Sequence, residues 1–404
     1  MNLSCTQCKL EHPEGTLGRC KNCGGILQVN YSDDLLTQLA EIHPGPGIDR
    51  YRALMPVSVP LPSLGEGDTP LIRSRRIGQE LGLQALYLKY EGCNPTGSFK
   101  DRAAVLVGAL TRESGAAGVL TASSGNAAAA ISAYSAAAGF RCVVLLEPES
   151  PPTKLRQILA NGAQVVPVEG LFASGPDAVN DLLSEVAHKL NYYLGFAWAP
   201  VNPFILEAVK TISYEIVARL PGAPEVVVSP VGGGDLLTAQ WRGYKELKRA
   251  GLIEKLPRMI GIQSEQAPPL LKAFRTGAEK IDALPFANSK ISGINVPFSG
   301  EHALAAIRES GGTAFGVADE DVFAMQRRVA LTEGLWIEPV SAISITALAG
   351  LLDQGKIETG ERIVCVLSGA GFKDPYLAKE QSEAMAKKLP VINDVNAIVE
   401  SIHK

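Results

Sequence analysis

The sequence predicts an α/β protein with two parallel-sheet lobes, a cleft between them and a small N-terminal appendage. Two sets of short apolar strands, each followed by a helix-like segment, support this prediction, because such alternation is typical of parallel sheets with right-handed crossovers. Of the 404 residues 40 are glycine and only 6% are aromatic, a bias that suits close packing of helices on sheets. The 46% hydrophobic content is sufficient for a large buried core.

Charge and hydropathy exclude several classes of protein. The chain has 38 basic and 42 acidic residues, a formal charge of −4, and no long basic run. This balance argues against nucleic-acid or membrane-surface binding. The first residues, MNLSCTQCKLEHPEG, contain no apolar secretory segment, and no apolar stretch is long enough to span a bilayer. We expect a cytoplasmic protein whose partner is a small-molecule substrate.

The first 32 residues predict a zinc-ribbon-like segment. Two CxxC pairs, Cys5 with Cys8 and Cys20 with Cys23, are separated by 11 residues. Four thiolates at this spacing can close a tetrahedral Zn²⁺ site with no open position, so the metal would be structural. A segment that has lost its metal, or whose thiols oxidise in pairs, is the alternative. Residues 33–62 are polar and rich in proline, and we predict a connector there.

Two strand–helix sets follow the connector and define the lobes. The first set predicts strands at 118–122, 142–146 and 163–168, with helices at 126–138 and near 153–160. The second predicts a strand at 225–229, a glycine triplet at 232–234, a helix through 247, and strands at 259–263 and 362–367. We assign residues 106–204 to the smaller lobe, and residues 63–105 and 205–404 to the larger one.

The segment from 89 to 102, KYEGCNPTGSFKDR, is the most informative part of the chain. It places Lys100 between a turn-rich stretch and an apolar, helix-like run. A lysine in such a place can form an imine with an aldehyde cofactor when desolvation lowers its pKa. A lysine before a helix is more often a solvated surface residue, so the function of Lys100 depends on the surrounding motifs.

An ordered series of motifs supplies that context. They are GEGDTPL (65–71), NPTGSFKDR (94–102), SSGNAAA (123–129), PVGGGDLL (230–237), EPVSA (338–342) and SGAGFKDP (368–375). With them the chain resembles the fold type II pyridoxal-phosphate (PLP) enzymes of the tryptophan-synthase β-subunit fold, and the threonine synthase family most closely. The resemblance covers nearly the whole chain. It implies that Lys100 is catalytic and holds the cofactor as a Schiff base, and that the protein is a homodimer.

The resemblance also implies roles for the other motif residues. The cofactor would be bound through its phosphate, ring oxygen and pyridine nitrogen by Gly232, Gly233, Gly234, Asn126 and Ser368. The substrate would be bound by Ser123, Ser124, Gly125, Asn126 and Asn202. These residue types suit the roles, because free N–H groups at a helix start attract anions and a hydroxyl leaves the pyridine nitrogen neutral. A helix N-cap or an ordinary turn would favour the same residue types.

The implied reaction is the conversion of O-phospho-L-homoserine and water to L-threonine and phosphate, with Lys100 moving protons as base and acid. Several positions depart from the family pattern: Ala103 for glycine, Asp235 for a small residue, Ser368 and Ala370 for threonine and histidine, and Asn180 near a frequent arginine.

These departures leave a second reaction class open. It is β-replacement or β-elimination on O-phosphoserine, serine or threonine through an aminoacrylate, as in cysteine-synthase-like, cysteate-synthase-like or dehydratase enzymes. A zinc-ribbon binding protein that kept an inactive enzyme fold is a third hypothesis. The intact Lys100 and glycine triplet argue against it.

Overall fold

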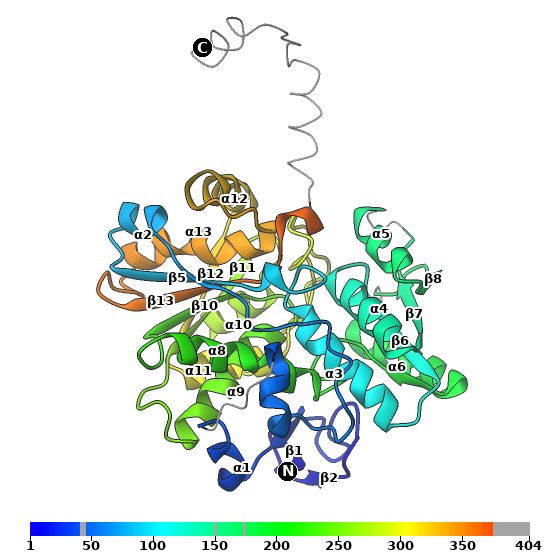
Figure 1. Cartoon of the computed structure of the whole chain (residues 1–404). Coiled ribbons are helices and arrows are strands. Elements are labelled where there is room, and N and C mark those ends of the chain that lie inside the picture. Colours follow the sequence, from blue (N-terminus) through cyan, green and yellow to red (C-terminus); the bar gives the residue numbers. More distant parts are fainter. Residues whose placement is uncertain (41–45, 149–151, 173–174, 375–404) are drawn as a thin grey trace, which may run out of the picture.

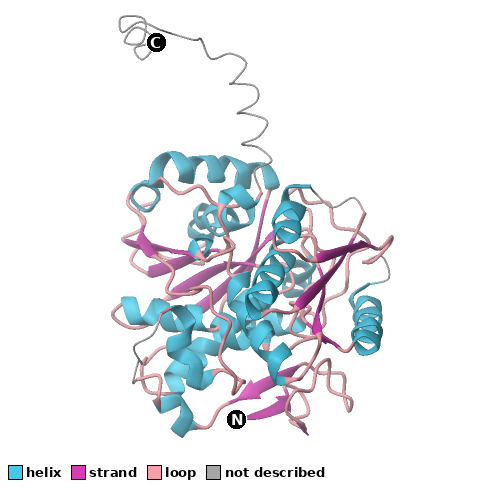
Figure 2. Ribbon diagram, turned by 45° about the vertical axis from the view of Figure 1, so that its right-hand side comes forward, coloured by secondary structure: helices cyan, strands magenta, loops and turns pink. Residues whose placement is uncertain are grey.

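Two α/β lobes lie side by side in the computed structural model, with the N-terminal segment beneath them (Figure 1). The structure describes residues 1–40, 46–148, 152–172 and 175–374. Pro375 and the rest of the chain that the sequence assigns to the larger lobe lie outside the described residues. The two sheets and the helices that cover them confirm the predicted α/β architecture (Figure 2).

The larger lobe contains a six-stranded sheet in the order β12-β11-β10-β13-β5-β4. Its strands are β4 (Leu71–Arg73), β5 (Ala85–Tyr90), β10 (Val226–Pro230), β11 (Arg258–Ser264), β12 (Thr313–Val317) and β13 (Arg362–Leu367). All neighbours are parallel except β4 and β5. The central strands β10, β11 and β13 are mostly apolar and buried, because helices cover both faces of the sheet.

Helices cover the two faces of this sheet in separate groups (Figure 1). On one side lie α2 (Arg76–Glu80), α12 (Asp319–Glu333) and α13 (Pro339–Asp353). On the other lie α8 (Thr211–Arg219), α9 (Asp235–Arg249), α10 (Pro269–Thr276) and α11 (Glu301–Glu309). None of the helices in the described residues is long and apolar enough to cross a membrane.

The smaller lobe has a four-stranded parallel sheet in the order β8-β7-β6-β9. Its elements are β6 (Gly118–Ala122), α4 (Asn126–Ala138), β7 (Arg141–Leu146), α5 (Pro152–Ala160), β8 (Gln164–Pro167), α6 (Gly175–Leu190) and β9 (Tyr192–Leu194). The predicted boundary at 105/106 falls inside α3 (Lys100–Glu113), which packs both on α4 and on α7 (Ile205–Val209). One continuous helix therefore connects the two lobes.

The N-terminal segment is a three-stranded antiparallel sheet in the order β2-β1-β3. Its strands are β1 (Asn2–Cys5), β2 (Glu11–His12) and β3 (Leu27–Asn30), and α1 (Asp33–Thr37) and a 3₁₀ helix (Gly47–Leu54) follow. The predicted connector is packed rather than loose, because Ile48, Tyr51 and Leu54 are buried. Tyr31 ties it to the core: its hydroxyl lies 2.7 Å from the carbonyl of Leu54 and 2.9 Å from Glu207.

Three predicted site segments follow the carboxyl ends of parallel strands. Ser123 follows β6, Gly232 comes shortly after β10, and Ser368 follows β13. Ligands of open α/β sheets bind beyond the carboxyl ends of the strands, so the topology itself brings these segments to one place.

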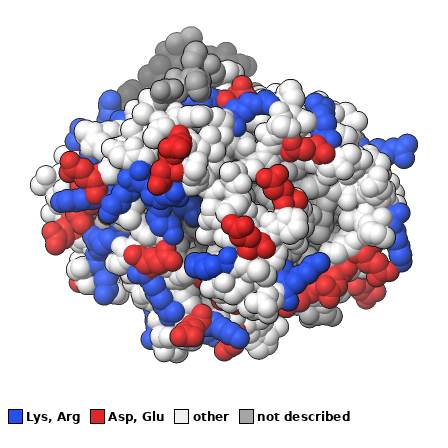
Figure 3. Space-filling view, turned by 90° about the horizontal axis from the view of Figure 1, so that it is seen from below, with Lys and Arg blue, Asp and Glu red and all other residues white. Residues whose placement is uncertain are grey.

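On the underside of the molecule, basic and acidic side chains are interspersed (Figure 3).

Candidate active site

A cavity of about 410 Å³ is lined by residues from both lobes. The smaller lobe contributes the turn from Ser123 to Asn126 together with Glu147, Phe172 and Phe196. The larger lobe contributes the glycine triplet, Asp235, the stretch 292–298 and Ser368. The cavity brings together every predicted cofactor-binding residue, and every predicted substrate-binding residue except Asn202.

Lys100 lies in this cavity as the first residue of α3. Its Nζ is 3.4 Å from the carbonyl oxygen of Ala197 and 4.8 Å from the centroid of the Phe99 ring. Burial lowers the pKa of Lys100, and the negative charge of Asp235 opposes this shift. A larger fraction of such a desolvated amine is unprotonated near neutral pH, and is therefore available as a nucleophile and proton acceptor.

A buried charge network fixes the start of α3. The fully buried Arg102 donates from Nε to Glu91 (2.7 Å) and from Nη1 to Glu215 (2.6 Å), and Lys89 donates to Glu215 at 2.5 Å. These bonds hold the first turn of α3 to β5 and α8, while Lys100 faces the cavity. The sequence analysis did not predict the network, although Lys89 within β5 and Glu91 directly after it were a visible signal.

The glycine triplet forms a cradle that larger residues would fill. Gly234 has φ +101°, and a Cβ there would lie 2.6 Å from that of Ala303. A Cβ on Gly233 would lie 3.0 Å from the Trp198 ring, and one on Gly232 would lie 3.3 Å from the carbonyl of Gly293. The three N–H groups form no hydrogen bond within the described residues. Free donors at the start of α9 suit the phosphate of a cofactor.

The turn from Ser123 to Asn126 leads into α4 on the opposite side of the cavity. The N–H of Gly125 donates to the Ser123 hydroxyl at 3.0 Å. Asn126 donates from Nδ2 to both carboxylate oxygens of Glu338, at 3.0 and 2.8 Å. Its Oδ1 is buried without a hydrogen bond in the described part of the chain. Sequence reasoning missed Glu338, although this residue begins the EPVSA motif.

Ser368 is buried where β13 ends. Its Oγ lies 3.3 Å from the Oγ of Ser341, and Ser341 in turn accepts from the N–H of Gly369 at 2.9 Å. These bonds orient a neutral hydroxyl toward the cavity that Ser368 lines. A hydroxyl at this position suits a neutral pyridine nitrogen, as the sequence predicts.

Asp235, which the sequence left unexplained, has two partners. Its Oδ1 accepts from the N–H of Ala199 at 2.9 Å and lies 3.1 Å from Nε2 of His302. Neither partner was evident from the sequence, because Ala199 precedes Asp235 by 36 residues and His302 follows it by 67. One oxygen of the carboxylate is thereby held against the segment 197–199 rather than against the glycine cradle.

Asn202, by contrast, does not line the cavity. Its side chain is fully buried, and its Nδ2 donates to the carbonyl of Leu194 at 3.3 Å. Its Oδ1 accepts from the N–H of Phe204 at 3.2 Å, so the side chain shapes the turn that leads to α7. Asn180, the other position considered for substrate phosphate, lies on α6 and is not a lining residue either.

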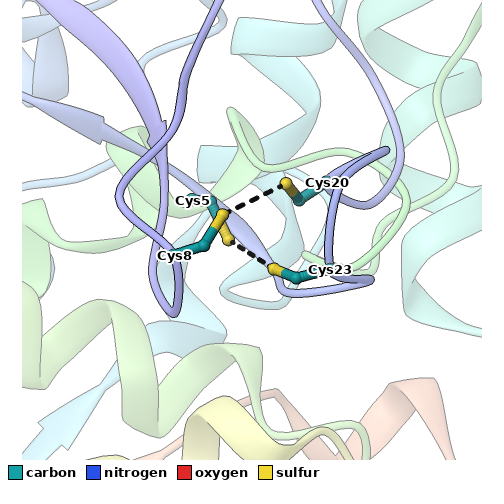
Figure 4. A group of neighbouring side chains, drawn as sticks. All are labelled: Cys5, Cys8, Cys20 and Cys23. Carbon is teal, nitrogen blue, oxygen red and sulfur yellow. Dashed lines mark hydrogen bonds between the residues drawn. The ribbon is translucent and has the colours of Figure 1, made fainter.

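The four N-terminal cysteines come together, with all their sulfur atoms within 4.8 Å of one another. Cys5 and Cys23 are 3.4 Å apart, and Cys8 and Cys20 are 3.7 Å apart (Figure 4). Tetrahedral zinc with Zn–S bonds of about 2.3 Å requires sulfur atoms about 3.8 Å apart. The arrangement is compatible with a zinc site.

A desolvated lysine, a glycine cradle with free N–H groups and a hydroxyl at a strand end define a pyridoxal-phosphate enzyme with two α/β lobes. The family model described as pyridoxal-phosphate dependent enzyme matches residues 62–369. Maize serine racemase shares the fold, with a TM-score of 0.69 and 19% identity over 89% of this chain and 99% of that one.

Two curated threonine synthases are similar over most of their length. That of Methanocaldococcus jannaschii is 40% identical over 90% of this chain and 91% of its own. That of Methanosarcina acetivorans is 36% identical over 99% and 98%. The chain therefore belongs to the pyridoxal-phosphate dependent enzymes, and within them to the threonine synthase family.

Proposed function

We propose that this protein is a PLP-dependent lyase that converts O-phospho-L-homoserine and water to L-threonine and phosphate. The observation that supports this best is the desolvated amine of Lys100, which shares one cavity with the glycine cradle and Ser368. The similarity to threonine synthases over nearly the whole chain supports the choice of substrate. A cytoplasmic location and a homodimer stay predictions.

The residues of the cavity would bind different parts of the cofactor and the substrate. Gly232, Gly233 and Gly234 would hold the phosphate of PLP with their N–H groups, Ser368 would face the pyridine nitrogen, and Lys100 would bind the aldehyde carbon. When bound, PLP supplies an electron sink for negative charge that develops at the substrate α-carbon. The turn from Ser123 to Asn126 would bind the substrate carboxylate at the start of α4.

Lys100 would carry the protons of the reaction. The amine of Lys100 would accept the proton from the substrate α-carbon and would deliver protons to later positions as general acid. The apolar surroundings of the amine keep it unprotonated often enough to act as a base. Phosphate leaves from the γ-carbon, and water adds at the β-carbon to give threonine.

One observation favours the second reaction class. Among the described residues that line the cavity, Lys100 is the single basic side chain, and Glu147 and Asp235 are acidic. A leaving phosphate is usually bound by cationic groups or N–H donors. The lining of this cavity is thus also suited to β-elimination or β-replacement on a substrate with an uncharged hydroxyl, such as serine or threonine. The basic side chains of Arg156 and Lys373 line an adjoining pocket, which shares Gly125 and Asn126 with this cavity.

Parallel product assays separate the two reactions. The holoenzyme is incubated with O-phosphohomoserine, O-phosphoserine, serine or threonine, with and without sulfide or sulfite, and the amino acid, oxo-acid and phosphate products are measured. We expect threonine and phosphate in equal amounts from O-phosphohomoserine. An oxo-acid from serine or threonine, or a nucleophile-dependent product from O-phosphoserine, without threonine from the first substrate, would assign the enzyme to the β-carbon class.

We propose, in addition, that Cys5, Cys8, Cys20 and Cys23 bind one structural zinc ion. Four thiolates leave no open position, so the metal would stabilise the N-terminal sheet and take no part in the reaction. We expect about one zinc per chain, and a lower melting temperature after chelation or in Cys8→Ser, with the kcat of the folded enzyme unchanged. Cys93→Ser is the matched control. Zinc well below one per chain in freshly purified protein would contradict the proposal.

A further inference from the structure

The pair formed by Asp235 and His302 is the feature of the site that the proposed reaction leaves unused. Both side chains are about nine-tenths buried, with 7% of Asp235 and 6% of His302 exposed. Asp235 lines the cavity that holds Lys100, whereas His302 lines a second cavity of about 950 Å³, which is also lined by the cysteine segment. The pair therefore spans the wall between the two cavities, beside the glycine cradle.

Asp235 controls the segment that contacts the amine of Lys100. Its carboxylate accepts from the N–H of Ala199, and the carbonyl oxygen of Ala197, two residues earlier, lies 3.4 Å from Lys100 Nζ. The indole of Trp198, between them, donates to the carbonyl of Gly233 at 3.3 Å. Residues 197–199 are thus tied to the glycine cradle on one side and to Lys100 on the other.

The tautomer of His302 leaves the charge of Asp235 in place. Nδ1 of His302 is buried and has no partner within the described residues. A bare ring nitrogen without a partner costs less than a buried N–H without an acceptor, so the neutral form with its proton on Nε2 suits this site. Nε2–H then donates to the carboxylate of Asp235. The neutral imidazole stabilises the carboxylate through this hydrogen bond and adds no positive charge beside it.

The negative charge of Asp235 acts on Lys100 in a desolvated cavity. Two other acidic groups lie near: Glu147 lines the cavity and accepts from the N–H of Phe172, and Glu338 accepts from Asn126. In the described part of the chain, Asp235 is the charge that opposes the effect of burial on Lys100. An opposite charge nearby favours the protonated amine, whereas burial favours the neutral one.

We propose that Asp235 is a positioning residue for Lys100, and that His302 sets the strength of its action. Asp235 holds the segment 197–199 against the cradle and supplies the negative charge that balances the Lys100 ammonium. His302 takes up part of that charge through its hydrogen bond. This inference rests on the proposed role of Lys100, and it explains an acidic residue beside a phosphate-binding loop.

The test measures the protonation of Lys100 directly. The full-length chain, freed of PLP with hydroxylamine, is labelled with trace acetic anhydride between pH 6 and 11, and acetylation of Lys100 is quantified by mass spectrometry. The Asp235→Asn variant keeps a side-chain oxygen that accepts from the N–H of Ala199, but it removes the negative charge. We expect Asp235→Asn to move the labelling midpoint down by about one pH unit.

Variants of His302 test the second half of the proposal. His302→Leu removes a donor, so the carboxylate acts more strongly on Lys100 and the midpoint moves up. His302→Gln keeps an N–H donor and leaves the midpoint within error of that of the wild type. Lys255, which is exposed and lines neither cavity, is the internal reference and is expected to keep its midpoint in every variant.

The outcomes separate a positioning role from a purely structural one. Unchanged Lys100 midpoints in Asp235→Asn and His302→Leu, with lower melting temperatures, would overturn the proposal. If Asp235→Asn does not fold, the comparison of His302→Leu with His302→Gln still decides it. Labelling uses no substrate, so unchanged midpoints would contradict the role of Asp235 without contradicting the proposed reaction. Product assays that contradict the proposed reaction would not change the measured midpoints.

Discussion

Replacing Lys100 by alanine is expected to lower kcat by at least about 10³-fold, because the variant loses both the covalent attachment of PLP and the group that moves the α-proton. The holoenzyme and the variant are compared by steady-state rates and by mass spectrometry after borohydride reduction, which makes attachment of the cofactor permanent. We expect a mass increase on Lys100 in the wild type and none in the variant.

Two controls define this result. Lys280→Ala removes an exposed lysine outside the cavity that holds Lys100 and should retain wild-type rates. Circular dichroism and the melting temperature of Lys100→Ala should stay close to those of the wild type, since the buried network holds α3 without Lys100. A variant that keeps more than a tenth of the wild-type kcat would remove Lys100 from the catalytic role.

Loss of one partner from the buried network is expected to have the largest effect on stability. Glu215→Gln leaves Arg102 and Lys89 with one fewer buried carboxylate, and an uncompensated buried charge typically costs about 3–5 kcal/mol. Denaturant unfolding measures the change. Glu185→Gln is the matched control, because its ion pair with Lys189 is exposed and contributes little. A loss below about 1 kcal/mol for Glu215→Gln would mean that the network does not hold α3.

The same network predicts how stability depends on pH. Burial raises the pKa of Glu91 and Glu215, but the charge of Arg102 more than offsets it, so that both pKa values lie below the ordinary range. Unfolded glutamates bind protons near pH 4.3, and the folded ones only at lower pH. The stabilisation is therefore present above about pH 4.3 and is lost as the pH falls below it. Glu215→Gln should flatten this part of the profile.

Local sequence predicted the elements of the site with good accuracy. The strand at 118–122, the helix at 126–138 and the strand at 362–367 have the predicted bounds. Each is apolar or rich in alanine and lies between turn residues, so its own composition determines its structure. The packed 3₁₀ helix at Gly47–Leu54 was missed, because its three buried side chains lie in a polar, proline-rich stretch.

Asn202 shows the limit of a resemblance that is carried over residue by residue. Its position matches the family pattern, yet its side chain bonds to the backbone of the turn and is not among the residues that line the cavity. Asp235 shows the opposite case: its departure from the family pattern is explained by its hydrogen bonds with Ala199 and His302, which are distant in the sequence.

The sequence by itself determined the fold class, the position of the lysine that we propose binds the cofactor, the glycine cradle and the four cysteines, because each follows from a contiguous motif or a fixed short spacing. The tertiary structure alone decided the pairings that orient these groups. Arg102 meets Glu215 across 113 positions, and Asn126 meets Glu338 across 212. Such contacts follow from the packing of two sheets and a shared helix, and no local periodicity encodes which distant charges will be buried together.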